Sequence, residues 1–154
     1  MKLFILIFVT SIAILHVDCA RGSRKQAEQN HFIHSKNEKT KEVKHFAIEM
    51  LNSSSTVELN FHADFEFKDL NGQIHGREYF LENYVEKTKN LEGKLCEAED
   101  VKIKLENRSN VYYVDIAELE IFCFETENRK FLNGMYIKMF ENNVIRRATA
   151  LNEK

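Results

Sequence analysis

The chain of 154 residues contains no tryptophan and carries a formal net charge of only −2. Its acidic and basic residues are interspersed, whereas nucleic acids and anionic membrane surfaces are bound through a concentrated cationic face. We therefore expect no nucleic-acid partner and no polybasic membrane contact. Without tryptophan, the large apolar volume of a core must come from the 12 phenylalanines and 5 tyrosines.

A long apolar run lies at the N-terminus, where Lys2 precedes residues 3–15. A positively charged start, an apolar run and compact residues before a cut site are typical of a secretory signal peptide, and Val17 and Cys19 suit a cut after Cys19. As a helix, residues 3–15 would reach about 20 Å, short of the roughly 30 Å apolar core of a bilayer. We expect residues 1–19 to be a cleaved signal peptide, the protein to be secreted and extracellular, and no membrane anchor.

The length of chain that remains after cleavage of residues 1–19 suits one domain with one core. Residues 20–35 are polar and without a period, which predicts a flexible N-terminal stub before a domain over residues 36–154. The spacing of Val43, Ala47 and Leu51 predicts a first helix that ends at Leu51, and a short second helix over residues 57–61 is expected next.

Residues 61–90 carry a hairpin pattern followed by a helical one. Phe65 and Phe67 alternate with charged residues, as in a strand with one apolar face. The turn residues 69–72 and a short return strand over residues 73–75 complete a hairpin. A further helix is predicted over residues 77–90, with Phe80, Leu81, Tyr84 and Thr88 on its buried face.

The C-terminal half predicts an antiparallel meander of strands, near residues 101–105, 111–125, 131–140 and 144–151. A turn at residues 107–110 would pair Val101 with Ile116, Ile103 with Val114 and Leu105 with Tyr112. After Ile116 the apolar residues change parity, which predicts a β-bulge within residues 115–117. Phe122 and Phe124 would then lie exposed on the outer face, where they would suit a homodimer contact.

Two cysteines and two sequons bear on secretion. Cys96 and Cys123 remain after cleavage, in a compartment that permits disulfides. They would share a face in an unbulged register, but the parity change separates them unless a second bulge intervenes, so their bonding stays open. Asn52 and Asn107 begin Asn-x-Ser triplets at expected turns, and we expect both to be glycosylated in a eukaryotic host.

The sequence His62-Ala-Asp-Phe-Glu-Phe-Lys-Asp-Leu-Asn-Gly72, continued by Gly76-Arg-Glu-Tyr-Phe80, resembles the nuclear transport factor 2-like superfamily, which includes ketosteroid-isomerase-like and SnoaL-like proteins. The element order is also similar over residues 38–151. The resemblance implies an α+β fold in which N-terminal helices pack in a strongly curved antiparallel sheet shaped as a cone. It further implies an apolar ligand cavity, for which the candidate lining residues are Phe65, Phe67, Phe80, Tyr84, Ile103 and Val114.

The resemblance also suggests catalytic residues. Asp69 matches the position at which steroid isomerases move a proton, although Leu70 follows it where those enzymes usually have proline. Tyr113 is the candidate electrophile from the meander. The alternative is that Asp69 only binds its own backbone as the first residue of a turn. His62 and Asp64 share a strand face, but without a third ligand they favour a capping role, so no metal or cofactor is expected.

Three functions can be compared on the basis of these residues. A secreted non-enzymatic domain could bind a small apolar ligand in the cone or a protein partner on the sheet, and the lack of a complete catalytic set favours it. An isomerase- or dehydratase-like enzyme would use Asp69 as general base. A cystatin-type protease inhibitor shares the outline of helix and sheet but would need a Gln-x-Val-x-Gly hairpin that is not found.

Overall fold

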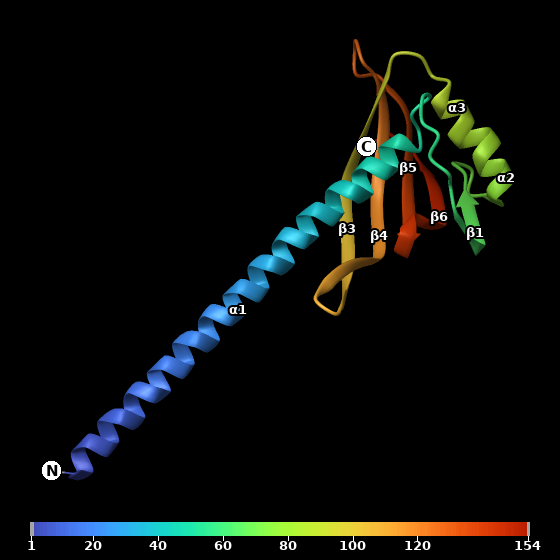
Figure 1. The fold of residues 1–154 in the computed structure, drawn as a ribbon. Coiled ribbons are helices and arrows are strands. Elements are labelled where there is room, and N and C mark those ends of the chain that lie inside the picture. The colour runs from blue at the N-terminus through green and yellow to red at the C-terminus, as the bar shows by residue number, and fades with distance from the viewer. Residues whose placement is uncertain (1, 154) are drawn as a thin grey trace. The chain divides into compact units, whose positions relative to one another are not determined.

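The computed structural model describes the backbone of residues 2–153 and the side chains of residues 22–153, and its fold is α+β (Figure 1). The chain divides into two units, residues 1–35 and 36–154. Helix α1, Lys2–Glu49, runs through the first unit into the second, so the stretch 20–35 that we expected to be a flexible stub is helical. The side chains of the expected signal peptide, residues 1–19, lie outside the described ones. Within the described part of the chain, no helix is both long and apolar enough to cross a membrane.

The end of helix α1 belongs to the domain core. Val43, Ala47, Met50 and Leu51 are at most 2% exposed and lie on one helical face, which confirms the periodicity expected there. The short second helix predicted over residues 57–61 is wrong, because residues 57–60 belong to no helix and Phe61 begins a strand. The backbone carbonyl of Asn60 accepts a hydrogen bond from the N–H of Ile145, so this segment is drawn toward the sheet instead.

The predicted hairpin and the helix after it are both present. Strands β1, Phe61–Lys68, and β2, Ile74–His75, pair antiparallel. The helix that follows consists of α2, Arg77–Phe80, a single π-helical turn, Leu81–Val85, and α3, Glu86–Lys89. A π-helical turn inserts one residue into the helical repeat. The fully buried positions are therefore Phe80, Val85 and Thr88, and Tyr84, which we expected on that face, is only partly buried.

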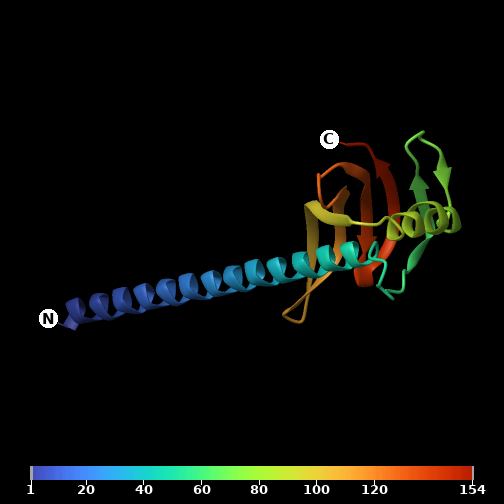
Figure 2. The same cartoon turned by 90° about the horizontal axis from the view of Figure 1, so that it is seen from above.

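The meander supplies the four other strands: β3, Lys94–Arg108, β4, Val111–Glu125, β5, Phe131–Phe140, and β6, Val144–Leu151. A short 3-10 turn, Glu141–Asn143, joins the last two. The strand order across the single sheet is β2-β1-β6-β5-β4-β3. All neighbours are antiparallel except β1 and β6, which are parallel, so the sheet is mixed and not wholly antiparallel as expected. Figure 2 shows the sheet curving around the helices of the domain.

The pairing of β3 with β4 differs from the predicted register by two residues near the turn, and by three beyond the next bulge, where Ile103 lies opposite Ala117 rather than Val114. Leu105 lies opposite Val114 rather than Tyr112, and Tyr112 lies opposite Asn107. The cause is the turn, since only Ser109 and Asn110 form the loop, both with positive φ (53° and 66°). Such two-residue loops suit the twist of a hairpin, and asparagine tolerates the left-handed conformation.

Two bulges shape this strand pair and bring the cysteines together. The predicted bulge is confirmed at Asp115, which is the extra residue between Val114 and Ile116. A second bulge interrupts β3 between Glu99 and Lys102, where Asp100 has φ of 46°. The second bulge cancels the parity change of the first, so Cys96 and Cys123 lie directly opposite each other and form a disulfide, with Cα atoms 4.0 Å apart.

The inner face of the sheet forms the core with the helices. Its buried side chains come mainly from the three central strands: Ala117, Leu119, Ile121, Cys123, Met135, Ile137, Met139, Ile145 and Ala148. On the outer face, the expectation that Phe122 is exposed is wrong, because it is only 3% exposed. Its ring lies over Gly134 on β5, where a Cβ atom would approach the ring to 2.8 Å, and it packs near Phe131.

The rest of the outer face is mainly charged, with Leu95 and Tyr113 as exposed apolar side chains at its margin. Glu118 and Lys138 are joined at 2.8 Å, and Glu66 lies 3.6 Å from Arg147. Phe124 is half-buried beneath the guanidinium of Arg129. This face therefore offers few of the exposed apolar side chains that a dimer contact across the face of the sheet would need.

Candidate ligand pocket

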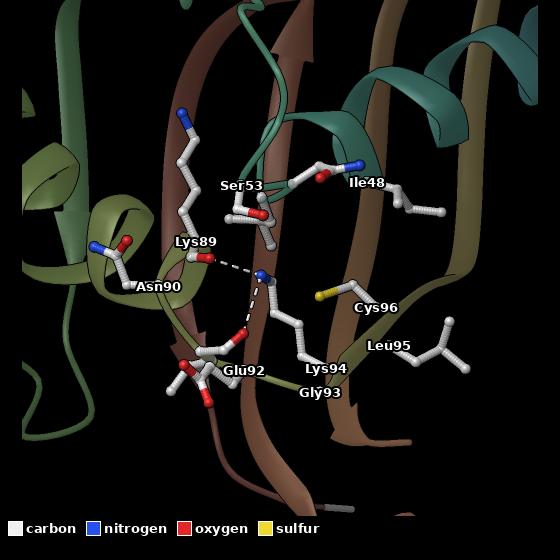
Figure 3. A pocket seen from close by; sticks show the side chains of 12 residues that line it. Ile48, Ser53, Lys89, Asn90, Glu92, Gly93, Lys94, Leu95 and Cys96 are labelled. Atoms are coloured by element: carbon white, nitrogen blue, oxygen red, sulfur yellow. Dashed lines mark hydrogen bonds between the residues drawn. The ribbon is translucent and has the colours of Figure 1, made fainter. Parts of the chain in front are cut away.

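A surface pocket of about 560 Å³ lies where three segments of the domain meet (Figure 3). These are the end of α1 with the turn after it, the loop that follows α3, and the start of β3. Its lining residues are Ile48, Leu51, Asn52, Ser53, Lys89, Asn90, Leu91, Glu92, Gly93, Lys94, Leu95 and Cys96.

The first wall is formed where helix α1 stops. The Oδ1 atom of Asn52 accepts hydrogen bonds from the backbone N–H and the hydroxyl of Ser54, at 3.1 and 3.0 Å. Asparagine side chains that bind the backbone two residues on form turns and compete with helix. Asn52 therefore stabilises the turn that follows α1, and Ser53 is left exposed at the pocket.

The opposite wall is fixed by Lys94. Its ammonium group donates to the backbone carbonyls of Lys89, at 2.8 Å, and Leu91, at 3.4 Å, as the dashed lines in Figure 3 show. Those carbonyls lie at the C-terminal end of α3, where a cation interacts favourably with unsatisfied carbonyls and with the helix dipole. Partial burial lowers the pKa of this ammonium group below its ordinary value.

Gly93 allows the chain to turn between α3 and β3. Its φ is +59°, in the left-handed region that glycine adopts without strain. The carbonyl of Gly93 accepts hydrogen bonds from both the backbone N–H and the hydroxyl of Thr126, each at 2.8 Å. The loop is thereby attached to the end of β4, which gives the pocket a fixed wall.

The pocket therefore has two chemical sides. Ile48, Leu51 and Leu91 provide aliphatic surface, and Lys94, Asn52 and Glu92 provide polar groups. Cys96 also lines it, so one sulfur of the disulfide belongs to the pocket wall. Such a combination suits an amphipathic small molecule, because ligand sites are mainly apolar with a few polar groups that fix orientation.

The expected ligand cavity does not coincide with this pocket. Phe65, Phe67, Phe80 and Tyr84 pack against one another, with ring centroids 5.1 to 6.0 Å apart. Ile103 and Val114 lie partly buried against the core. None of these six residues lines the 560 Å³ pocket. The four aromatic side chains therefore contact one another and do not contribute to this pocket.

Tyr84 also anchors the helix to the sheet. Its hydroxyl donates to the backbone carbonyl of Gly134 at 2.5 Å. The hydroxyl of Thr88 donates to the carbonyl of Tyr84 at 2.7 Å and accepts from the side-chain amide of Asn133 at 2.6 Å. Burial raises the pKa of the Tyr84 hydroxyl, so it remains a neutral donor.

The two candidate catalytic residues are not brought together. Asp69 lies in the turn between β1 and β2, at one edge of the sheet, whereas Tyr113 lies on β4, next to the opposite edge strand. Tyr113 is 39% exposed and its ring lies beneath the guanidinium of Arg108. No shared site between these residues follows from the topology.

Asp69 has its carboxylate engaged within its own hairpin. Oδ1 accepts the backbone N–H groups of Asn71 and Gln73, both at 2.9 Å, and Oδ2 lies 2.9 Å from Nε2 of His75. These contacts, with His75 first, hold the pKa of Asp69 below its ordinary value. A carboxylate with a lowered pKa is a weaker base, which disfavours the proton-transfer role.

His75 is a contact that sequence reasoning missed. Besides its contact with Asp69, its ring stacks on Tyr79 with centroids 3.7 Å apart. The short hairpin places it six residues after Asp69 and directly beside it. The pattern of Asp, turn and His was available in the sequence as a signal for this pair.

Both sequons lie at turns. Asn107 is exposed near the end of β3, and its Oδ1 accepts the N–H of Asn110 at 3.1 Å. Asn52 is half-buried at the pocket, with Ser53 and Ser54 exposed beside it. Glycosylation of either residue stays a prediction.

The fold and the pocket define an α+β protein with a mixed six-stranded sheet and a solvent-open site beside its edge strand. Within the described residues, no group of three or more His, Cys, Asp or Glu side chains is placed to hold a metal ion. Comparisons with models of known protein families, with curated proteins and with solved structures found no match.

Proposed function

We propose that this chain is a secreted, non-enzymatic domain that binds a small amphipathic ligand in the pocket between the end of α1 and the start of β3. The observation that carries the proposal is the pocket itself, with its aliphatic side chains and the ammonium group of Lys94. Its volume of about 560 Å³ falls within the range of about 300 to 1,000 Å³ usual for small-molecule sites.

The proposal keeps the expectation of an apolar ligand but changes its position. The aromatic side chains expected to line a cone pack against one another, which supports assigning the ligand to the open side pocket. An isomerase- or dehydratase-like activity is not favoured by any contact of Asp69, since both of its carboxylate oxygens are engaged in the turn.

Nuclear transport factor 2-like architecture is part of the proposal. It is supported by the element order of helix, short hairpin, helix and four-stranded meander, which agrees with the order that the resemblance implied. It is also supported by the curvature visible in Figure 2 and by the bulges that accompany it. Fold alone does not decide among ligand binding, catalysis and protein docking, so the function depends on the pocket.

Secretion is supported by three independent features. The N-terminal apolar run has the order of a signal peptide. The disulfide between Cys96 and Cys123 suits an oxidising compartment. The two Asn-x-Ser triplets begin at turns, where a glycan can be accommodated.

The pocket can be tested by filling it. Ser53 is exposed and lines the pocket, so Ser53→Trp would occupy the space without disturbing the core. Thr56 is equally exposed on the same connecting segment but does not line the pocket, which makes Thr56→Trp the matched control. The probe is anilinonaphthalene sulfonate, an anionic apolar dye whose fluorescence rises in apolar sites.

We expect Ser53→Trp to weaken dye binding by about tenfold or more, equivalent to ~1.4 kcal/mol, and Thr56→Trp to bind like the wild type. Equal binding by all three proteins would contradict the assignment of the ligand to this pocket. Native mass spectrometry of the protein recovered from culture medium would then report cleavage after Cys19, glycans and any retained ligand. Retention of the N-terminal segment in a cell-associated product would contradict secretion.

A further inference from the structure

Strand β3 presents a long free edge. It lies at the end of the strand order and spans 15 residues. In an antiparallel pair, alternate residues direct their N–H and C=O groups away from the partner strand, and non-hydrogen-bonded pairs have Cα atoms about 4.5 Å apart. Cys96 and Cys123 form such a close pair at 4.0 Å, so the backbone groups of Cys96 point to the free edge. Because the pattern repeats at every second residue, the backbone groups of Ala98 also point to the free edge.

The same alternation can be read from the other end of β3. A two-residue loop is closed by a hydrogen-bonded pair, here Arg108 opposite Val111. Counting back along β3, the backbone groups of Leu105 and Ile103 then point to the free edge. The edge therefore carries two sets of outward N–H and C=O groups, on either side of the bulge at Asp100.

The side chains on the outer face of this strand are charged in a self-complementary order. From N- to C-terminus the strand carries two acidic residues, then the bulge, then two basic residues: Glu97, Glu99, Lys102 and Lys104. Two identical strands that run antiparallel about a two-fold axis in the bulge would therefore place acids opposite bases. Opposite charges directly across an antiparallel pair are stabilising, and like charges are destabilising.

We infer that β3 pairs antiparallel with β3 of a second copy of this chain, about a two-fold axis between Asp100 and Val101. Such a contact is isologous, as in most homodimers. The pairs across the axis are Glu97 with Lys104 and Glu99 with Lys102 on the outer face, and Cys96 with Leu105 and Ala98 with Ile103 on the inner face.

This register agrees with the backbone as well as with the charges. The four inner residues are the ones whose N–H and C=O groups point outward, so each inner pair exchanges two hydrogen bonds. Cys96, Ala98 and Ile103 are partly buried against the core of their own copy, and pairing would extend that apolar face across the axis. A shift of two residues toward the hairpin would instead oppose Glu97 to Glu106 and set each bulge against regular strand.

Bulges and charged residues commonly protect sheet edges from pairing. Here the Asp100 bulges of the two copies both fall on the two-fold axis, so they interrupt only the centre of the new hydrogen-bond ladder. Two of these charges already have partners, since Glu97 pairs with Arg129 and Lys104 with Asp115. Both ion pairs are exposed, so they contribute little to stability and can be exchanged for pairs across the dimer axis. The contact differs from a dimer across the outer sheet face, because it uses the strand edge.

The test uses charge reversal in the full secreted chain, with mass measured by sedimentation over a concentration series. One variant is Lys102→Glu/Lys104→Glu and the other is Glu97→Lys/Glu99→Lys. We expect a wild-type dimer, two monomeric variants, and a heterodimer when the variants are mixed. The control Lys68→Glu/Lys87→Glu reverses two exposed charges on other elements and should remain dimeric.

A measurement on the unchanged protein avoids any effect of the substitutions on folding. Hydrogen exchange should show slow exchange at the amides of Cys96, Ala98, Ile103 and Leu105 in the dimer, and fast exchange after dilution. A wild type that stays monomeric at every concentration, variants that remain dimeric alone, folded variants that do not associate on mixing, or concentration-independent exchange at these amides would each overturn the inference.

Discussion

Reduction of the Cys96–Cys123 disulfide should cost this domain a large share of its stability. The bond closes a loop with a sequence separation of 27. A cross-link stabilises mainly by removing loop-closure entropy from the unfolded chain, and a loop of this length gives about 3.5 kcal/mol at room temperature. With a urea m-value of about 2 kcal/mol/M, the unfolding midpoint should fall by about 1.7 M.

The assay is urea unfolding followed by far-ultraviolet circular dichroism, with and without a phosphine reductant. Because reduction removes no side-chain heavy atom, the thiol of Cys123 still occupies the buried site, and the change reports mainly the loss of the cross-link. The control Cys96→Ala/Cys123→Ala should not respond to the reductant. An unchanged midpoint in wild-type protein whose two thiols are shown by mass to be free would refute the reasoning.

Two further predictions concern the sheet and the first hairpin. Gly134→Ala would set a methyl group 2.8 Å from the buried ring of Phe122, so we expect a loss of about 1 to 3 kcal/mol in the free energy of unfolding. Urea unfolding measures this loss. If Gly134→Ala were as stable as the wild type, the ring of Phe122 would have to move aside without cost, and the reasoning would be wrong. The lowered pKa of Asp69 means that its stabilising contribution is present above its ordinary pKa of 3.8 and is lost as pH falls through the lower folded value. Wild-type protein should therefore be more stable than Asp69→Asn at neutral pH, and the difference should shrink below pH 3.8; a constant difference across that range would count against the contact with His75.

Most of the fold could be predicted from patterns within single segments. Alternation in β1 and the turn after it indicated the hairpin, and the parity change on β4 located the bulge at Asp115. These predictions succeeded because each depends on a period that the local sequence carries. The second bulge, between Glu99 and Lys102, carries the same signature, since the apolar residues change parity from Cys96 and Ala98 to Val101 and Ile103, but the strand predicted from the sequence begins only at residue 101, past the bulge.

The pocket could not be predicted for a different reason. Its walls come from segments near Ile48, Leu91 and Lys94, and none of these carries a chemical motif. They meet only because the chain turns after α1, at residues 50–54, and the loop after α3 turns at Gly93. The aromatic residues of β1 and the following helix were correctly expected to be clustered, but whether their rings enclose a space or fill it depends on packing, which spacing does not reveal.

The parallel pairing of β1 with β6 has a consequence for how the chain reaches its native state. β6 follows the other five strands in the chain, lies between β1 and β5 and, within the described residues, is the only strand that joins the β1–β2 hairpin to the rest of the sheet. Until the ribosome has released Val144–Leu151, the nascent chain holds two separate groups of strands with open edges. Loss of β6 would thus split the molecule's sheet, whereas loss of a segment of similar length at the start of α1 would leave every strand pair in place.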